Sequence, residues 1–257
     1  MKVGYVYDPV YLKHETGGHP ENAQRLEAVM AHLEETRLIE QLTSIKPRPA
    51  TIKEVSYVHQ ASYVSRIQDA AVRGGGWLDA DTVMSPDSYD AALYAAGGVI
   101  EAVAAVMGGE ADSAFALVRP PGHHAEASRA MGFCLFNNAA IAAQYLIDKC
   151  RLTRILIVDW DLHHGNGTQH SFYERSDVLY FSTHQYPHYP GTGNWDETGK
   201  NSGEGYTVNV PLSAGKTDED YLFIFRHILR PIVSSYKPQF ILVSAGFDIH
   251  QNDPLGA

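Results

Sequence analysis

Two aspartates and two histidines follow directly on an apolar segment in the run VDWDLHHGNG, residues 158–167. The segment before them, residues 154–158, is predicted to be a strand, and the alternation of a strand places Asp159 and Asp161 on the same side. Two carboxylates this close repel each other unless a cation or a proton lies between them. Mixed carboxylate and imidazole ligation suits a divalent transition metal, with zinc as the first candidate. The alternative, a solvated loop with capping residues, is disfavoured because ionisable groups at a buried strand end are costly without a partner.

A second pair of histidines, His123 and His124, follows the sequence Pro-Pro-Gly, so a rigid turn sets its direction. Imidazole titrates near neutrality, which suits proton transfer at physiological pH. Adjacent histidines can also form a weak surface metal site or belong to an ordinary loop. A third polar position, Asp248, follows the strand-like residues 240–244, where a lone aspartate is more often a helix cap than a ligand.

Strand-like and helical segments alternate along the chain. The predicted strands are 3–7, 113–118, 154–159, 178–183, 206–210 and 239–244, and the predicted helices are 21–35, 62–73, 86–107, 138–149 and 218–236, with a short helix after a capping box at 51–54. This alternation predicts an α/β fold with a mostly parallel sheet flanked by helices. No repeat, low-complexity segment or linker interrupts it, so we expect a single domain over residues 1–257.

The polar segments of this layout each follow a predicted strand. In open α/β sheets, ligands bind outside the carboxyl ends of the strands. We therefore expect the tandem histidines, the run at 158–167 and Asp248 to converge on one crevice. The long loop at 184–205 should shape the mouth of that crevice.

Composition narrows the class of partner. The formal charge of −10 argues against nucleic acid as a partner, because phosphates demand a basic surface, and agrees better with a cationic substrate. No apolar run approaches 18 residues, so we expect no membrane span. Only two cysteines are present, which gives no disulfide framework and predicts a reducing, cytoplasmic location.

Taken together, these residues resemble the histone deacetylase family, which includes acetylpolyamine amidohydrolases and acetoin-utilisation proteins. The motifs that carry the resemblance are HPENAQRL at 19–26, RPPGHH at 119–124, GFCLFNNAAIAA at 132–143, VDWDLHHGNGTQ at 158–169, YPGTG at 189–193 and SAGFD at 244–248. The resemblance implies an arginase/deacetylase-like α/β fold and a zinc hydrolase that releases acetate from acetyl-lysine or a related acylated amine. It leaves room for assembly as a homodimer or tetramer.

The resemblance also implies roles for particular residues. It places one Zn²⁺ on three ligands and catalysis on a tandem pair with two supporting residues; these are Asp161, His163 and Asp248 for the metal, and His123, His124, Asp159 and Asn166 for catalysis. Asp159 matches the acid that supports the first histidine. Asn166 stands where one branch of the family has a second such Asp, which is similar to the class II branch.

The substrate and a structural cation receive residues in the same way. The resemblance implies two aromatic walls of an acyl-lysine tunnel, a rim acid and a position close to the rim, at Phe133, Tyr189, Asp81 and Leu255. It also implies a K⁺ or Na⁺ site at Asp159, Asp161, His163 and Ser182, with Thr183 beside them. A polyamine-selective branch of the family places Glu where this chain has Leu255, so the leucine favours acyl-lysine.

One departure from the family concerns a tyrosine that polarises the amide carbonyl, well downstream of the third metal ligand. No tyrosine follows Asp248 in these 257 residues. We therefore expect the C-terminal part to be missing and residues 1–257 alone to be nearly inactive.

Three alternatives to an acetyl-lysine deacylase remain open. The first is an acetylpolyamine amidohydrolase. The second is an arginase-type metallohydrolase, whose D-x-H-x-D motif does not fit VDWDLHH. The third is a non-catalytic acyl-lysine-binding protein that keeps the pocket, and its only support is the missing tyrosine.

Overall fold

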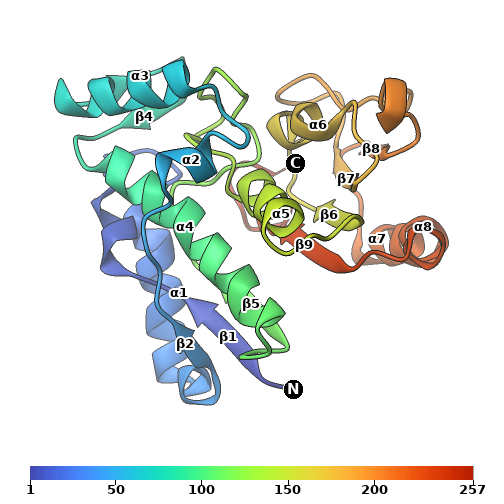
Figure 1. The fold of residues 1–257 in the computed structure, drawn as a ribbon, viewed down its shortest axis with the longest axis horizontal. Helices are drawn as coiled ribbons and strands as arrows, with labels where there is room; N and C mark the ends of the chain where they lie inside the picture. Colours follow the sequence, from blue (N-terminus) through green and yellow to red (C-terminus); the bar gives the residue numbers. More distant parts are fainter. Residues whose placement is uncertain (257) are drawn as a thin grey trace. The chain divides into compact units, whose positions relative to one another are not determined.

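The computed structural model describes residues 1–256, and its contacts divide the chain into two compact units, Met1–Cys150 (unit 1) and Arg151–Ala257 (unit 2). The longer strands pair in parallel, in one sheet within each unit, and unit 1 adds a small antiparallel hairpin (Figure 1). The α/β class and the parallel pairing predicted from the sequence are confirmed. The single domain over residues 1–257 stays a prediction.

Unit 1 is built around a three-stranded parallel sheet in which β1 (Val3–Val6) lies between β2 (Thr43–Ile45) and β5 (Ser113–Ala116). Its other elements are α1 (Ala23–Glu35), α2 (Ile52–Val55), α3 (Ala61–Val72), α4 (Ser88–Met107), α5 (Asn138–Asp148), the hairpin of β3 (Gly76–Trp77) and β4 (Val83–Met84), and 3-10 turns at Pro9–Lys13 and Leu38–Gln41. The capping box predicted at the start of α2 forms between Thr51 and Glu54.

Helix α4 is the longest helix of unit 1 and contacts α5, β1 and β5 (Figure 1). Two adjacent glycines allow its close approach to the chain around it. A Cβ at Gly97 would collide with the carbonyl oxygen of Arg48, and a Cβ at Gly98 would lie 2.6 Å from the hydroxyl of Tyr11. The helix therefore packs against backbone at Gly97 and against side chains at Gly98.

By length and composition alone, α4 is apolar enough to cross a membrane, although the sequence predicted no such segment. Just over half of its apolar window is buried inside the protein. Ala92, Ala96 and Ile100 pack into one core cluster with Ile141 of α5. A buried core helix has the same composition as a membrane span, and the packing of α4 is that of a core helix.

Unit 2 is built around a four-stranded parallel sheet with the order β8-β7-β6-β9. The strands are β6 (Ile155–Asp159), β7 (Val178–Gln185), β8 (Thr207–Leu212) and β9 (Phe240–Ser244), and the helical elements are α6 (Asn166–Phe172), a 3-10 turn at Asn201–Gly203, α7 (Asp218–Ile224), a π turn at Phe225–Leu229 and α8 (Arg230–Tyr236). Every residue of β6 is buried, as expected of a central parallel strand.

The helix predicted at 218–236 is interrupted by the π turn between α7 and α8. Pro231 explains the interruption. Proline has no backbone N–H, and in a regular α-helix its ring would clash with the carbonyl of His227, four residues earlier. Widening the turn before Pro231 removes that clash while the helix continues.

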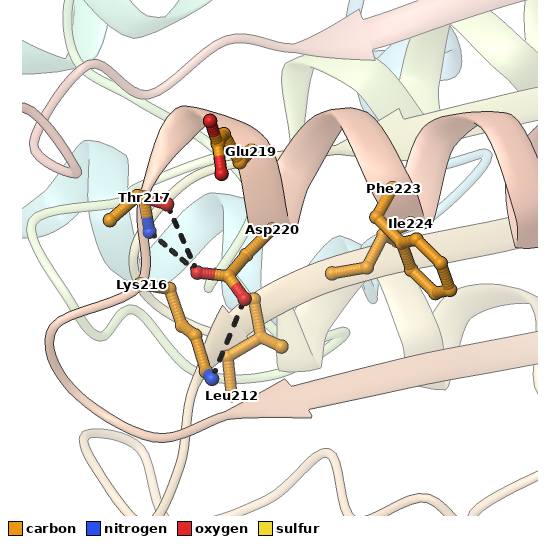
Figure 2. Close-up of a pocket in the computed structure, with 7 residues that line it drawn as sticks. All are labelled: Leu212, Lys216, Thr217, Glu219, Asp220, Phe223 and Ile224. Atoms are coloured by element: carbon orange, nitrogen blue, oxygen red, sulfur yellow. Dashed lines mark hydrogen bonds and ion pairs between the residues drawn. The ribbon is translucent and has the colours of Figure 1, made fainter.

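A shallow hollow lies where β8 leads into α7, lined by Leu212, Lys216, Thr217, Glu219, Asp220, Phe223 and Ile224 (Figure 2). The backbone N–H of Thr217 donates to Asp220 Oδ2 at 2.9 Å, and Lys216 Nζ lies 3.6 Å from Asp220 Oδ1. These contacts form a capping box with an added ion pair, and they start the helix. We therefore interpret the polar groups of this hollow as helix capping.

His14, His59 and His184 are buried histidines, with at most 3% of each side chain exposed. Burial lowers the pKa of each imidazole to about 4. In unit 1, His59 Nε2 accepts the backbone N–H of Asn137 at 2.9 Å, so Nδ1 carries the proton and donates to the carbonyl of Glu126 at 2.8 Å. This neutral histidine bridges two points of the chain.

We expect these histidines to make the fold sensitive to acid. Between about pH 6.5 and pH 4 these imidazoles bind protons in the unfolded chain but stay neutral in the folded protein. The free energy of unfolding therefore falls as pH falls. The slope is at most about 1.4 kcal/mol per pH unit for each group. Chemical denaturation at pH 7, 6 and 5 should show a shallower slope for His59→Gln than for the wild type. His32→Gln, at an exposed position, is the control; equal slopes in His59→Gln and the wild type would contradict the prediction.

Candidate functional site

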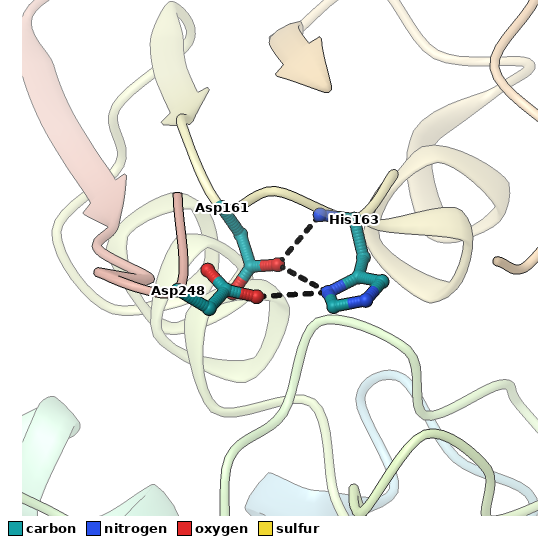
Figure 3. A group of neighbouring side chains, drawn as sticks. All are labelled: Asp161, His163 and Asp248. Atoms are coloured by element: carbon teal, nitrogen blue, oxygen red, sulfur yellow. Dashed lines mark hydrogen bonds and ion pairs between the residues drawn. The ribbon is translucent and has the colours of Figure 1, made fainter. Parts of the chain in front are cut away.

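Asp161, His163 and Asp248 form a compact group in unit 2, with one ligand atom from each lying within 4.8 Å of the others (Figure 3). Asp161 and His163 follow β6, whereas Asp248 follows β9. These two strands pair in parallel, with Asp159 opposite Ser244. The carboxyl ends of neighbouring strands therefore bring residues about 85 positions apart to one place, as expected of a parallel sheet.

The two carboxylates point at the same nitrogen of the His163 ring (Figure 3). His163 Nδ1 lies 3.1 Å from Asp161 Oδ1 and 2.8 Å from Asp248 Oδ2. Backbone donors hold both acids: the N–H of His163 donates to Asp161 Oδ1 at 2.8 Å, and that of Leu162 to Asp248 Oδ1 at 3.1 Å. The approach needs a glycine, because a Cβ at Gly246 would collide with the Asp161 carboxylate.

The charge of the group favours a cation. Burial lowers the pKa of His163, but hydrogen bonds to Asp161 and Asp248 and their negative charges outweigh it and raise the pKa to about 10. A protonated imidazole thus supplies the positive charge that the two acids require. Nδ1, which faces both acids, is a metal-donor atom once deprotonated. Two carboxylates and one imidazole are a donor set that a divalent transition metal accepts, so these residues fit a metal ion.

Asp159, predicted to support catalysis and a monovalent cation, is fully buried at the end of β6. The hydroxyl of Tyr180 donates to Asp159 Oδ2 at 3.2 Å and accepts the backbone N–H of Gly165 at 3.1 Å. Ser182, another predicted cation ligand, stands opposite Asp159 on β7 and bonds His184 Nδ1 at 2.9 Å. The role of Tyr180 could not be predicted, because a tyrosine within an apolar strand gives no sign of its partner.

Two aromatic side chains stand next to His163 in unit 2. The ring of His188 stacks on it at a centroid distance of 5.3 Å, and Tyr189 meets it edge-on at 6.0 Å. Tyr189 was predicted to line the site, and the structure places it beside His163, one of the candidate metal ligands. His250 is exposed, and Asn166 is buried as the first residue of α6.

The tandem histidines lie in unit 1, with ring centroids 4.0 Å apart. His124 is buried to 4% exposure, and its ring rests on Gly132, where a Cβ would collide with it. The segment that leads to the pair begins at Arg119, which is buried with Glu21 and donates to Glu21 Oε2 at 2.8 Å through Nη2. A buried, two-pronged ion pair therefore fixes the base of the loop.

The predicted rim acid and one predicted tunnel wall also meet in unit 1. The hydroxyl of Thr82 accepts the backbone N–H of Phe133 at 3.1 Å and donates to Asp81 Oδ1 at 3.2 Å. The ring of His19 meets that of Phe133 edge-on at 4.4 Å. Burial, followed by the hydrogen bond and charge of Asp79, raises the pKa of Asp81. No role was predicted for Thr82, or for His19 of the motif HPENAQRL, because a partner far away in the chain leaves no local sequence signature.

Leu255, the predicted rim position, is half-buried in the C-terminal turn, where its N–H donates to Asp253 Oδ1 at 2.9 Å. The structure thus groups the predicted residues within each unit: the metal ligands and Tyr189 in unit 2, the tandem histidines in unit 1, and Asp81 with Phe133 in unit 1. The convergence of all these segments, including the support of His123 by Asp159, stays a prediction.

Comparison with known proteins gives a consistent result. The family model described as "Histone deacetylase domain" matches residues 19–257. A probable deacetylase of Archaeoglobus fulgidus is 45% identical over 99% of this chain and 71% of its own length. Histone deacetylase 15 of Arabidopsis thaliana is 43% identical over 93% of this chain, which spans 44% of that protein. The crystal structure of the HDA15 HD domain matches with a TM-score of 0.95 at 41% identity, covering 99% of this chain and 74% of that one.

We expect the chain to bind one divalent transition-metal ion at Asp161, His163 and Asp248. Because the metal displaces the proton held by His163, binding should release about one proton and tighten as pH rises. Titration calorimetry in buffers of different ionisation enthalpy measures both effects. Asp248→Ala should weaken binding by more than about 100-fold, the upper end of what residues outside the ligand set cost. Asp196→Ala, at an exposed position, is the control. Equal affinities of Asp248→Ala and wild type would refute the assignment.

Proposed function

We propose, since this chain belongs to the histone deacetylase domain family, that it hydrolyses N-acetyl or related N-acyl amides and releases acetate from acetyl-lysine or a similar acylated amine. The observation that carries the proposal is the group of Asp161, His163 and Asp248 at the ends of paired strands. The names of the relatives, probable deacetylase and histone deacetylase, support deacetylation as the reaction.

We assign zinc to this group because two carboxylates and one imidazole leave an open position around a four-coordinate ion. When bound, zinc supplies a water of lowered pKa and a Lewis acid for the amide carbonyl. The chain's part is to hold the ligands in place. Backbone N–H groups already fix both carboxylates, so little rearrangement is required of Asp161 and Asp248.

The proton chemistry falls to the tandem histidines. Amide hydrolysis requires a base to take the proton of water and an acid to return it to the leaving amine. We assign both to His124, whose burial favours a neutral imidazole before it takes the proton of water. His123 is the more exposed of the two, so solvent helps it to carry a lasting positive charge. That charge stabilises the oxyanion that forms at the carbonyl.

The substrate is bound through aromatic walls and an acidic rim. We propose that Phe133 and Tyr189 enclose the acyl-bearing chain, and that Asp81 accepts a hydrogen bond from the substrate beyond it. The contact of Tyr189 with His163 supports its part, and the Thr82 bridge supports the pairing of Phe133 with Asp81. The charge of −10 suits a cationic substrate such as a lysine-rich peptide.

Three further proposals rest on the sequence and the family. Asp159, Asp161, His163 and Ser182 hold a K⁺ or Na⁺ ion, and the register of Asp159 with Ser182 supports this pairing. The protein acts in the cytoplasm, and it assembles as a homodimer or tetramer. Acetylated polyamines are the alternative substrate, which Leu255 disfavours.

The proposal is tested by acetate release from acetyl-lysine peptides and acetylpolyamines in the complete natural protein. His124→Ala should lower kcat by about 10²–10⁴-fold, the usual cost of losing a general acid–base. His123→Ala should cost less, because the metal also stabilises the oxyanion. His32→Ala, at an exposed position, serves as the control, and bound zinc is measured in each protein. Equal, small losses in both variants would refute the assignment, and no acetate from any substrate would refute the function.

A further inference from the structure

The loop after β7 carries His188 and Tyr189, the two aromatic neighbours of His163, and hydrogen bonds to residues outside this loop hold its tip. We call residues 186–198 the Tyr189 loop. Within it, Glu197 turns back onto the turn around Gly193. Glu197 Oε1 accepts the backbone N–H groups of Gly193 and Asn194, each at 2.9 Å. Glu197 thus closes the loop on itself.

The other oxygen of Glu197 leaves the loop. Glu197 Oε2 accepts Gln169 Nε2 of α6 at 2.6 Å. Gln169 is 1% exposed, so its amide has no solvent to turn to. Its oxygen accepts Asn209 Nδ2 at 2.7 Å and lies 2.9 Å from His164 Nε2. Gln169 therefore links Glu197 to His164, the residue that follows His163 in the sequence.

The ionised carboxylate of Glu197 sets the direction of each hydrogen bond in the series that runs from Glu197 through Gln169 and His164 to Thr192. An ionised carboxylate only accepts, so Gln169 must turn its NH₂ toward Glu197 and its oxygen toward His164. His164 must then carry its proton on Nε2 and accept on Nδ1. Nδ1 lies 2.8 Å from the hydroxyl of Thr192, which returns the chain to the Tyr189 loop. The hydrogen bonds thus form a closed circuit that runs from the Tyr189 loop to Gln169 of α6, on to His164, and back to the loop.

The loop also packs directly against this circuit. A Cβ at Gly193 would lie 2.6 Å from the ring of His164 and 2.5 Å from His184 Nε2. His184 Nε2 bonds the carbonyl of Gly193 at 2.8 Å. Gly193 has a positive φ of 90°, which glycine adopts without strain. A shift of the loop would therefore break hydrogen bonds and contacts together.

We propose that Glu197 is a positioning residue that holds the Tyr189 loop beside His163 by setting the donor–acceptor order through Gln169 and His164. Its carboxylate binds the backbone of Gly193 and Asn194 and the side chain of Gln169, and in the proposed reaction it does not bind the substrate. The effect on turnover rests on the proposed function, whereas the effect on the loop does not.

A charge-conserving exchange tests the order of donors. Glu197→Gln places an NH₂ group where only acceptors fit. That group then faces another donor, which is either the NH₂ group of Gln169 or the backbone N–H groups of Gly193 and Asn194. Gln169→Glu places two carboxylates at hydrogen-bonding distance. In the double variant, the new amide at position 197 donates to the new carboxylate at position 169. That carboxylate still accepts from Asn209 and His164, so only the bond between positions 169 and 197 reverses and every other bond keeps its direction. Glu204→Gln is the matched control, since Glu204 accepts an exposed hydroxyl contact from Thr198 at 2.9 Å.

Hydrogen exchange of the backbone amides in the Tyr189 loop is the first readout, with the amides of β6 as the internal reference. Each single variant should speed exchange in the loop by about tenfold or more, the equivalent of one charged hydrogen bond. The double variant and Glu204→Gln should match the wild type. Fluorescence of Trp195, 71% exposed on the same loop, should follow the same pattern. Unchanged exchange in Glu197→Gln, or failure of the double variant to restore it, would overturn the proposal.

Kinetics and metal binding separate this inference from the proposed function. With acetyl-lysine substrate, Glu197→Gln should raise KM by about tenfold while kcat changes less, and zinc affinity should stay that of the wild type. A loss of zinc affinity equal to that of Asp248→Ala would overturn the positioning role. If no protein, the wild type included, releases acetate, the proposed function fails, and the exchange pattern still decides the role of Glu197.

Discussion

The repulsion between Asp161 and Asp248 is the constraint on which the rest of unit 2 depends. Parallel pairing of β6 with β9 delivers both acids to one strand-end edge, and backbone N–H groups fix them there. Such an arrangement is stable only with a positive charge between the carboxylates. The ring of His163 occupies that position, and the loops that follow β6 and β7 are arranged around the ring.

In unit 1 the main constraint is the burial of polar groups that support the loop of the tandem histidines. Arg119 and Glu21 neutralise each other below the tandem histidines, and His59 stays neutral between two backbone groups. Each of these buried groups has a partner that matches its donors and acceptors, which is the condition for a polar interior. The loop thereby gains a fixed shape without losing the polar side chains that chemistry needs.

The central strands and the proximity of Asp161, His163 and Asp248 could be predicted, because apolar runs locate buried strands and the order of the strands, with the family resemblance, brings these three residues together. Leaving Pro231 out of account made one continuous helix of a segment that the structure interrupts with a π turn. The residues that escaped prediction have distant partners: Gln169 and Glu197 are 28 positions apart, and Thr82 and Phe133 are 51 apart. The strands β2, β3 and β4 were missed because two or three residues are too few to show a period.

The apolar character of α4 has a consequence during synthesis. Helix α4 ends at Met107, whereas α5, which covers part of it, is complete only at Asp148. Ribosomes add about 5–20 residues per second, so roughly 2–8 s separate the two events. Throughout that interval the side of this apolar helix that packs on α5 lacks its cover, although β1, β2 and α3 are already made. During synthesis, docking of α5 onto α4 therefore competes with binding of α4 by chaperones or targeting factors that recognise exposed apolar helices.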